Sequence, residues 1–545
     1  MPRIKRFVKA LDWKEFFAPD TGQHRIGRTL LVRGLGFIYL VAILSWWPQA
    51  TLLVGEQGLQ PACRTLDFLR ERLVPEGAPG FLVFPNLFWF TGASDFALNA
   101  VCMAGTLLAL LVIAGRFIGP ALAGLWILYL SLVNTGGVFM SFQWDILLLE
   151  AGFLALFLCR WEVRTPWSRP SPLTPVNRVA LVLSWFLIAK LMFLSGWVKL
   201  AWASEDAPEW WPAGTAMSYH YMTQPLPSWT AWWMHQLPAW FHRLSLVPMY
   251  LVELVLPFLV LLGKWGRLAA AIGFSGLMIL ILLTGNFTYF NWLTIVLCLP
   301  LVHDRFWPPL FRKLLGADPL ANESPRSRRH LISGWALAAP PLLALILLQI
   351  HVLLHDFHDA PRPLLKESLS PRWLDTFASS LSQFYLASGY GLFRTMTTER
   401  PEIILEGSAD GTNWLPYDFA WKVDEIDDRP RFVAPHQPRV AWQFWFAALE
   451  GRFDYRSRNA GWFESLVVKL FEGDQKVKRL LKFDPFPDTP PQRIRARLMR
   501  YEFTTPEERR ATGDWWKRVV IGEYLPEVRP PARDTAASAT SPDLP

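Results

Sequence analysis

Nine long apolar runs occupy the first two-thirds of the chain, and they constrain its fold more than any other feature. A helix that crosses a bilayer needs about 20 mostly apolar residues, because the hydrocarbon core is about 30 Å thick and each residue rises about 1.5 Å. Some of the runs are shorter than this, and short runs can be re-entrant. We predict a polytopic α-helical membrane domain over residues 29–355, with about nine transmembrane helices. The runs cover residues 29–48, 95–115, 119–139, 144–160, 179–200, 246–263, 266–284, 286–302 and 331–354.

The composition supports this division of the chain. Of its 545 residues, 52% are hydrophobic and only 18% are charged, whereas soluble proteins carry about 25% charged residues. The net charge of +8 comes from basic residues beside the apolar runs, which is typical of membrane topology. We find no stripe of basic residues interleaved with aromatic residues in a soluble domain, so we expect no nucleic-acid partner. Four cysteines without a CxxC motif indicate neither a disulfide framework nor a zinc finger.

The positions of lysine and arginine predict the orientation. Basic residues in short loops mark the cytoplasmic side of a membrane protein. Here they cluster in the N-terminal flank (residues 1–28) and then after every second run, for example at Arg116, Lys264 and Arg267. We therefore predict a cytoplasmic N-terminus and an extracytoplasmic domain over residues 356–528.

The C-terminal domain has the patterns of a soluble α+β fold with a small β-sheet. Residues 401–406 and 414–421 flank an Asp-Gly turn, which indicates a hairpin. Residues 439–450 and 461–471 have helical spacing, and residues 492–503 alternate as a strand does. The tail, residues 529–545, is rich in proline, alanine and serine, and we expect it to be disordered.

Acidic residues inside the fourth run need an explanation. Asp145 and Glu150 stand in otherwise apolar sequence, where an unpaired carboxylate costs a few kcal/mol or more. Asp145 can be explained as an interfacial cap of a helix that begins at Ile146. Glu150 lies too deep for capping, so we expect it to pair with a basic residue of a neighbouring helix, for which Lys190 and Lys199 are available. Such a pair either fixes helix register or forms a functional polar centre.

Two groups of histidines have both a structural and a chemical interpretation. His220 and His235 could form an acid–base pair, but the tryptophans around them favour anchoring at the membrane surface. His351, His355 and His358 have helical spacing at the end of the last run, together with Asp356, and histidines at i and i+4 share one face, as metal-binding histidines do. The sequence places no further ligand beside them, so we predict no metal and no cofactor.

Aromatic motifs in the C-terminal domain carry no nucleophile, base or phosphate loop. Clusters of this kind belong either to a core or to a protein-binding surface, where tryptophan, tyrosine and arginine dominate the binding energy. The candidates for client binding are Tyr390, Phe393, Arg394, Trp414, Trp442, Trp445 and Phe446.

Several long motifs, in order, resemble the lipase maturation factor family along almost the whole chain. They are SFQWDILLLEAGFLA (141–155), LMFLSGWVKL (191–200), YHYMTQPLP (219–227), TGNFTYFN (284–291), YGLFRTMTTERPEIILEGSADGTNW (390–414), WQFWFAAL (442–449) and RYEFT (500–504). The membrane part is also distantly similar to the helical domain of vitamin K-dependent γ-carboxylases.

The resemblance implies a non-enzymatic role. Animal members of the family sit in the endoplasmic reticulum membrane and help dimeric secreted lipases to fold and assemble, with the C-terminal domain in the lumen contacting the client. We predict a membrane-anchored, chaperone-like maturation factor for exported proteins, lipases among them. Its location is either the endoplasmic reticulum membrane or a bacterial inner membrane with the C-terminal domain in the periplasm.

The carboxylase likeness implies a rival function, an enzyme with an intramembrane polar site near the extracytoplasmic surface. On this hypothesis five polar side chains line one cavity. They are Asp145, Glu150, Lys190, Lys199 and His220.

Overall fold

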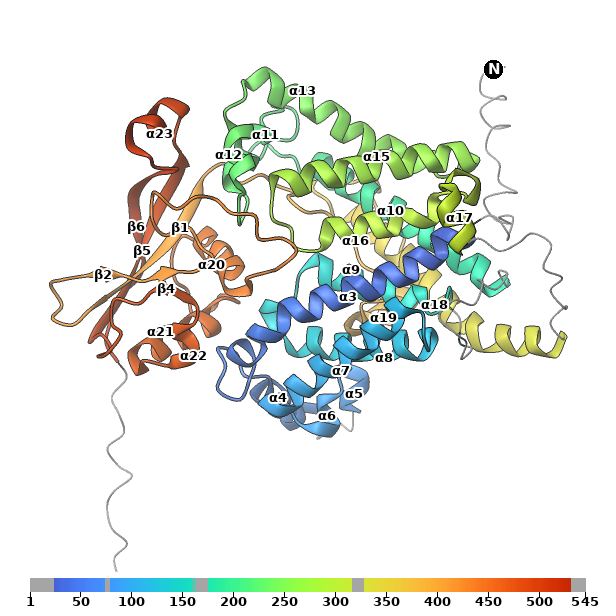
Figure 1. Ribbon diagram of the computed structural model, residues 1–545, viewed down its shortest axis with the longest axis horizontal. Coiled ribbons are helices and arrows are strands. Elements are labelled where there is room, and N and C mark those ends of the chain that lie inside the picture. The colour runs from blue at the N-terminus through green and yellow to red at the C-terminus, as the bar shows by residue number, and fades with distance from the viewer. Residues whose placement is uncertain (1–23, 74–78, 160, 162–174, 316–327, 531–545) are drawn as a thin grey trace, which may run out of the picture. The chain divides into compact units, whose positions relative to one another are not determined.

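A computed structural model of the chain describes residues 24–73, 79–159, 161, 175–315 and 328–530. It divides into two compact units (Figure 1). Unit 1 consists of residues up to Thr398 together with Pro430–Pro438, and unit 2 consists of Glu399–Arg429 and the residues from Arg439 onward. The basic loop within residues 162–174 and the tail from residue 531 lie outside the described residues.

Seven helices among the described residues of unit 1 are long and apolar enough to cross a membrane. They confirm the predicted membrane domain of about nine spans, seven of which meet the length and hydropathy expected of a crossing helix. One of them is built from α13, the π-helical turn η2 and α14. The elements are α3 (Arg25–Leu53), α7 (Asp95–Ala114), α8 (Ile118–Thr135), α10 (Pro175–Ala201), α13 (Ala239–Tyr250), η2 (Leu251–Val255), α14 (Leu256–Leu259), α15 (Gly263–Thr284) and α18 (Arg328–His358).

Two of the nine predicted spans form shorter helices than the other seven. The run at 144–160 yields α9 (Gln143–Ala155), and the run at 286–302 yields α16 (Phe290–Cys298), followed by the 3₁₀ turn η3 (Leu299–Leu301). The 13 residues of α9 extend about 20 Å at 1.5 Å each, well short of the ~30 Å core. Hydropathy alone did not show where these helices begin and end.

Shorter helices lie between the spans of unit 1 and after the last of them. They are α4 (Ala62–Leu73), α5 (Gly80–Val83), α6 (Phe88–Thr91), α11 (Ala216–Thr223), α12 (Trp229–His235), α17 (Pro309–Leu315) and α19 (Arg372–Leu381), with the 3₁₀ turns η1 (Gly137–Phe139), η4 (Asp304–Phe306) and η5 (Ser382–Phe384).

Helix α3 packs against several elements of unit 1, among them α7, α9 and α16 (Figure 1). Small residues let the backbones approach closely. A Cβ atom on Gly27 would lie 2.3 Å from the Leu299 carbonyl oxygen, and one on Gly152 of α9 would lie 2.0 Å from the Tyr39 hydroxyl. Small residues at crossings are a common means of packing membrane helices.

Unit 2 contains the predicted small sheet. Four antiparallel strands lie in the order β2-β1-β5-β6, and a second, two-stranded sheet pairs β3 with β4. Helix α20 packs on β1, and Phe444 of α20 contacts the rings of Trp462 and Phe463 of α21. The elements are β1 (Arg400–Ser408), β2 (Leu415–Pro416), β3 (Asp418–Phe419), α20 (Arg439–Leu449), α21 (Ala460–Glu472), α22 (Gln475–Lys478), β4 (Leu481–Phe483), β5 (Arg493–Phe503), α23 (Pro506–Thr512) and β6 (Trp516–Val528).

The sequence patterns located four of these ten elements. Residues 401–406, 439–450, 461–471 and 492–503 correspond to β1, α20, α21 and β5. The predicted strand at 414–421 is instead two short strands in different sheets. Strand β6 was missed, because its middle is a run of exposed residues without alternation. The contact division also places residues 356–398 in unit 1, whereas we predicted a domain boundary at 356.

The close approach of α3 and α9 predicts a specific cost for a single methyl group. Gly152→Ala would push a Cβ against the buried Tyr39 hydroxyl, and overpacking of this kind costs about 1–3 kcal/mol. We expect a lower midpoint of thermal unfolding for the purified protein in detergent. Gly276→Ala in α15 is the matched control, since its Cβ would meet nothing within 4 Å, and an equal loss for both variants would contradict the packing argument.

Candidate functional site

A buried ion pair joins three helices of unit 1. Lys190 of α10 contacts Glu150 of α9 at 2.8 Å between Nζ and Oε1, and both side chains are almost fully buried. Gln349 of α18 accepts a hydrogen bond from Lys190 at 2.6 Å and donates one to Glu150 at 2.7 Å. The predicted pairing of Glu150 with a basic residue is confirmed.

The second oxygen of the Glu150 carboxylate is also satisfied. The hydroxyl of Tyr390 donates to Oε2 at 2.5 Å, and the backbone N–H of Ser388 donates to it at 3.2 Å. Burying a carboxylate is tolerated only when it is paired and hydrogen-bonded. The network formed by Glu150, Lys190, Gln349 and Tyr390, here called the Glu150 network, meets this requirement.

Asp145 has a different environment from the one predicted. Helix α9 begins at Gln143 and not at Ile146, and Asp145 is fully buried. Its Oδ1 atom lies 2.6 Å from the hydroxyl of Tyr129 and 2.6 Å from that of Tyr289. The interpretation as an interfacial cap is therefore wrong, since two tyrosine donors hold this carboxylate inside the bundle.

A second buried ion pair lies farther along α10. Lys199 contacts both carboxylate oxygens of Glu253 at 2.8 and 2.7 Å, and it donates to the Ser195 carbonyl at 3.0 Å. Glu253 belongs to the π-helical turn η2, a feature that often occurs at functional sites. Gly196 allows this approach, because a Cβ there would lie 2.8 Å from the Glu253 Cβ.

Lys199 and Glu253 line a cavity of about 1070 Å³ in unit 1, and most of its other walls are apolar. His220 of α11 also lines it and lies beside the rings of Phe287 and Phe393, with centroids 6.4 and 4.9 Å away. The Nδ1 atom of His220 is buried without a hydrogen-bond partner. Burial and the nearby Lys199 ammonium lower the pKa of His220 to about 4, so the imidazole is neutral at pH 7.

The five residues of the rival enzyme hypothesis are not brought together. Lys199 and His220 share the cavity, but Asp145, Glu150 and Lys190 are absent from its lining. The sequence marked Glu253 as a carboxylate within the sixth run but did not pair it with Lys199, and Gln349 was not predicted as a member of the Glu150 network. The sequence feature that could have identified both residues is that each is polar and lies inside an apolar run.

The residues predicted to bind a client have varied environments. Tyr390 is buried in the Glu150 network, and Phe393 lines the cavity. The guanidinium carbon of Arg394 lies 4.7 Å from the centre of the Trp202 ring. That of Arg495 lies 4.1 Å from the centre of the Trp414 ring. In α20, Trp442 and Trp445 are buried, whereas Phe446 is 38% exposed. Burial within unit 1 makes Tyr390 unsuited to surface contact, and the role of the others stays a prediction.

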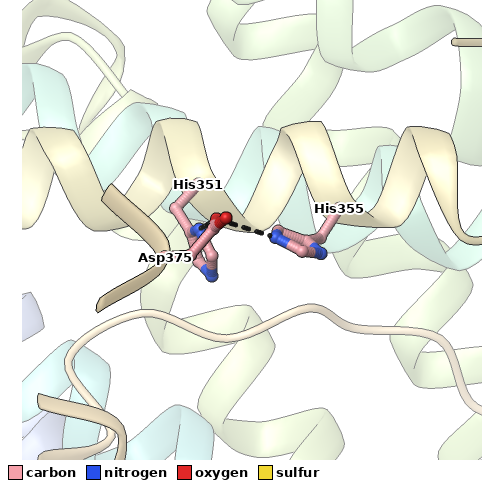
Figure 2. A group of neighbouring side chains, drawn as sticks. All are labelled: His351, His355 and Asp375. Atoms are coloured by element: carbon pink, nitrogen blue, oxygen red, sulfur yellow. Dashed lines mark hydrogen bonds and ion pairs between the residues drawn. The ribbon is translucent and has the colours of Figure 1, made fainter. Parts of the chain in front are cut away.

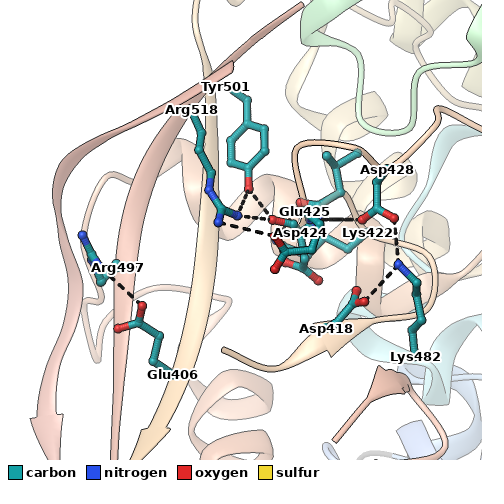
Figure 3. A network of polar contacts seen from close by, with 11 residues as sticks. Glu406, Asp418, Lys422, Asp424, Glu425, Asp428, Lys482, Arg497, Tyr501 and Arg518 are labelled. Atoms are coloured by element: carbon teal, nitrogen blue, oxygen red, sulfur yellow. Dashed lines mark hydrogen bonds and ion pairs between the residues drawn. The ribbon is translucent and has the colours of Figure 1, made fainter. Parts of the chain in front are cut away.

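A polar network in unit 2 fixes the segment after β3 against the sheet (Figure 3). Lys422 contacts Asp424 at 2.5 Å and Glu402 of β1 at 3.4 Å. Burial alone would lower the pKa of Lys422, but these carboxylates outweigh it and hold the pKa above its usual value. The Tyr501 hydroxyl of β5 donates to the Asp424 carbonyl at 2.7 Å.

The edge strand of the unit 2 sheet presents apolar side chains to solvent. Strand β6 pairs with β5 on one side and is last in the strand order. Val519, Val520 and Ile521 are each between 43% and 52% exposed. An exposed strand edge with apolar residues is a site at which another extended chain can add.

Two family descriptions match the chain. The lipase maturation factor transmembrane domain matches residues 26–309, and the lipase maturation factor C-terminal domain matches residues 386–526. Lipase maturation factor 2 of Xenopus tropicalis is 31% identical, over 93% of this chain and 83% of that protein. Lipase maturation factor 1 of Homo sapiens is 32% identical, over 94% and 90%. No solved structure matches the chain with comparable significance.

The Glu150 network predicts how substitutions in it combine. Lys190→Met would leave a buried carboxylate without its cation, and breaking such a pair costs about 3–5 kcal/mol. We expect much less folded protein in detergent, measured by size-exclusion chromatography and thermal unfolding. The double variant Glu150→Gln/Lys190→Met removes both charges and should recover most of the lost stability. A double variant as unstable as Lys190→Met would contradict a stabilising role of charge pairing.

Proposed function

Because this chain belongs to the lipase maturation factor family, we propose that it is a membrane-anchored factor that helps exported proteins, lipases among them, to mature. The observation that carries the proposal is a match to both domains of the family, with more than nine-tenths of the chain aligned to each relative named above. The names of both relatives refer to lipase maturation.

The edge of β6 is the surface we propose for client contact. An incompletely folded or unassembled polypeptide exposes apolar side chains and unpaired backbone groups. A strand edge can satisfy the backbone groups, while Val519, Val520 and Ile521 cover apolar surface. Native edge strands usually avoid exposed apolar residues, so their presence supports an interaction role.

The predicted orientation supports contact with an exported client. The nine predicted spans are odd in number, and their alternation places Arg116, Lys264 and Arg267 on the same side as the N-terminal flank. An odd number places the N-terminal flank and unit 2 on opposite sides of the membrane. With the basic N-terminal flank in the cytoplasm, unit 2 would face the compartment in which exported proteins fold.

The cavity of unit 1 favours a second candidate function, an enzyme acting on an apolar, membrane-soluble substrate. Its supporting observation is that a neutral His220, a lysine and a carboxylate line one largely apolar space. A neutral imidazole can accept a proton from a bound substrate. Three facts weigh against this function: a pKa lowered to about 4 makes His220 a weak base, Lys199 is neutralised by Glu253, and Glu150 and Asp145 are held elsewhere.

Substitution on the β6 edge tests the maturation role. In cells whose own gene copy is deleted, we expect the restored chain to raise the activity of a secreted lipase per milligram of lipase. Val520→Lys places a charge on the proposed contact surface and should weaken client binding by roughly tenfold, ~1.4 kcal/mol, and so lower this specific activity. Phe483→Lys, at an exposed position on β4, should retain it. Equal lipase activity with and without the gene would overturn the proposal.

Substitution in the cavity separates the two candidate functions. His220→Gln removes the proposed base and breaks no hydrogen bond to Nδ1, which has none. The maturation factor should keep its effect on lipase specific activity and its thermal stability. Loss of the effect at unchanged stability would favour the enzyme hypothesis instead.

A further inference from the structure

Three potential metal ligands lie together where α18 meets α19 (Figure 2). His351 and His355 project from the same face of α18, and Asp375 comes from the first turn of α19. The ligand atoms of the three side chains lie within 4.8 Å of one another. The sequence suggested the two histidines but could not place the third residue, because Asp375 belongs to a separate helix.

The distances suit a tetrahedral zinc site. Zinc binds histidine nitrogen and carboxylate oxygen at about 2.0–2.2 Å, so two ligand atoms at neighbouring corners of a tetrahedron lie about 3.4 Å apart. Asp375 Oδ1 lies 3.3 Å from His351 Nδ1 and 3.2 Å from His355 Nε2. Small side-chain movements would therefore place all three atoms around one ion.

The groups around the three side chains also suit a metal site. Asp359 contacts His355 Nδ1 at 3.1 Å, and a carboxylate on the second ring nitrogen commonly orients a metal-binding histidine. The Ser370 hydroxyl donates a hydrogen bond to the Asp375 carboxylate.

We propose that His351, His355 and Asp375 bind a divalent zinc ion and leave a fourth coordination position open. Two imidazoles and one carboxylate are the donors that zinc accepts in sites with three protein ligands, whereas Mg²⁺ and Ca²⁺ prefer oxygen alone. The three side chains are 20%, 38% and 42% exposed, so an ion and a fourth ligand can reach them.

A plain ion-pair network is the competing explanation of the same contacts. In that case protonated histidines would pair with Asp359 and Asp375, and no metal would bind. The two explanations differ in a measurable way, since zinc requires neutral histidines and releases protons when it binds. Zinc binding by the intact protein therefore decides between them.

The test uses the full chain, purified in detergent and freed of metal with a chelator. We expect calorimetric titration with ZnCl₂ to show one site that is lost in His351→Gln/His355→Gln and weakened at least tenfold in Asp375→Asn. His358→Gln is the matched control. His358 lies on the same helix, but its Nδ1 contacts the Leu365 carbonyl oxygen, and it is not one of the three ligands.

Two further readouts complete the test. Zinc should raise the midpoint of thermal unfolding of the unsubstituted protein and of His358→Gln, but not that of the double variant. The unfolding midpoint of the double variant without metal shows whether this variant folds. CoCl₂ should give visible absorption typical of a tetrahedral site, and MgCl₂ should give no binding. The proposal is overturned if the unsubstituted protein and the double variant bind the same amount of zinc, or if His358→Gln also loses the site.

Discussion

Burial of the Glu150 carboxylate is the constraint on which unit 1 depends. A charge within an apolar bundle must receive a counter-charge and hydrogen bonds on both oxygens, or the bundle loses several kcal/mol. Glu150 obtains them from α10, from α18 and from the segment at residues 388–390. The carboxylate therefore ties segments distant in sequence to the short helix α9. Because its hydrogen-bonding capacity is used within the protein, Glu150 acts as a part of the scaffold.

The same principle accounts for how far the sequence could predict this region. A lone glutamate in an apolar run requires a basic partner, so the pairing was predictable. The choice of Lys190 over Lys199 was not, since both lie on α10 and the choice depends on how α9 and η2 pack against it. The hydrogen-bond partners of Asp145 could not be predicted, for a different reason. Tyrosines within apolar runs are common, and nothing in the sequence marks Tyr129 and Tyr289 as donors.

The fold was predictable where local patterns decide it and unpredictable where tertiary contacts do. Periodicity located β1, β5, α20 and α21, whereas hydropathy overestimated the length of α9 and α16. Strand β6 lacks alternation because its middle is exposed on an edge. The same exposure that hid β6 from pattern analysis supports its proposed role in client contact. The possible zinc ligands show the same limit, since only folding brings Asp375 to His351 and His355.

Exposure of unit 2 to the compartment in which exported proteins fold is the claim on which the proposed role depends. Cysteine labelling in sealed vesicles whose cytoplasmic face points outward tests it directly. With Cys63 and Cys159 replaced by serine, a single new cysteine is introduced at the exposed Arg510 of α23, and a second protein carries one at Arg116 as the cytoplasmic control. A membrane-impermeant maleimide should label position 116 at once and position 510 only after detergent opens the vesicles. Labelling of position 510 in intact vesicles would place unit 2 in the cytoplasm and contradict the proposed function.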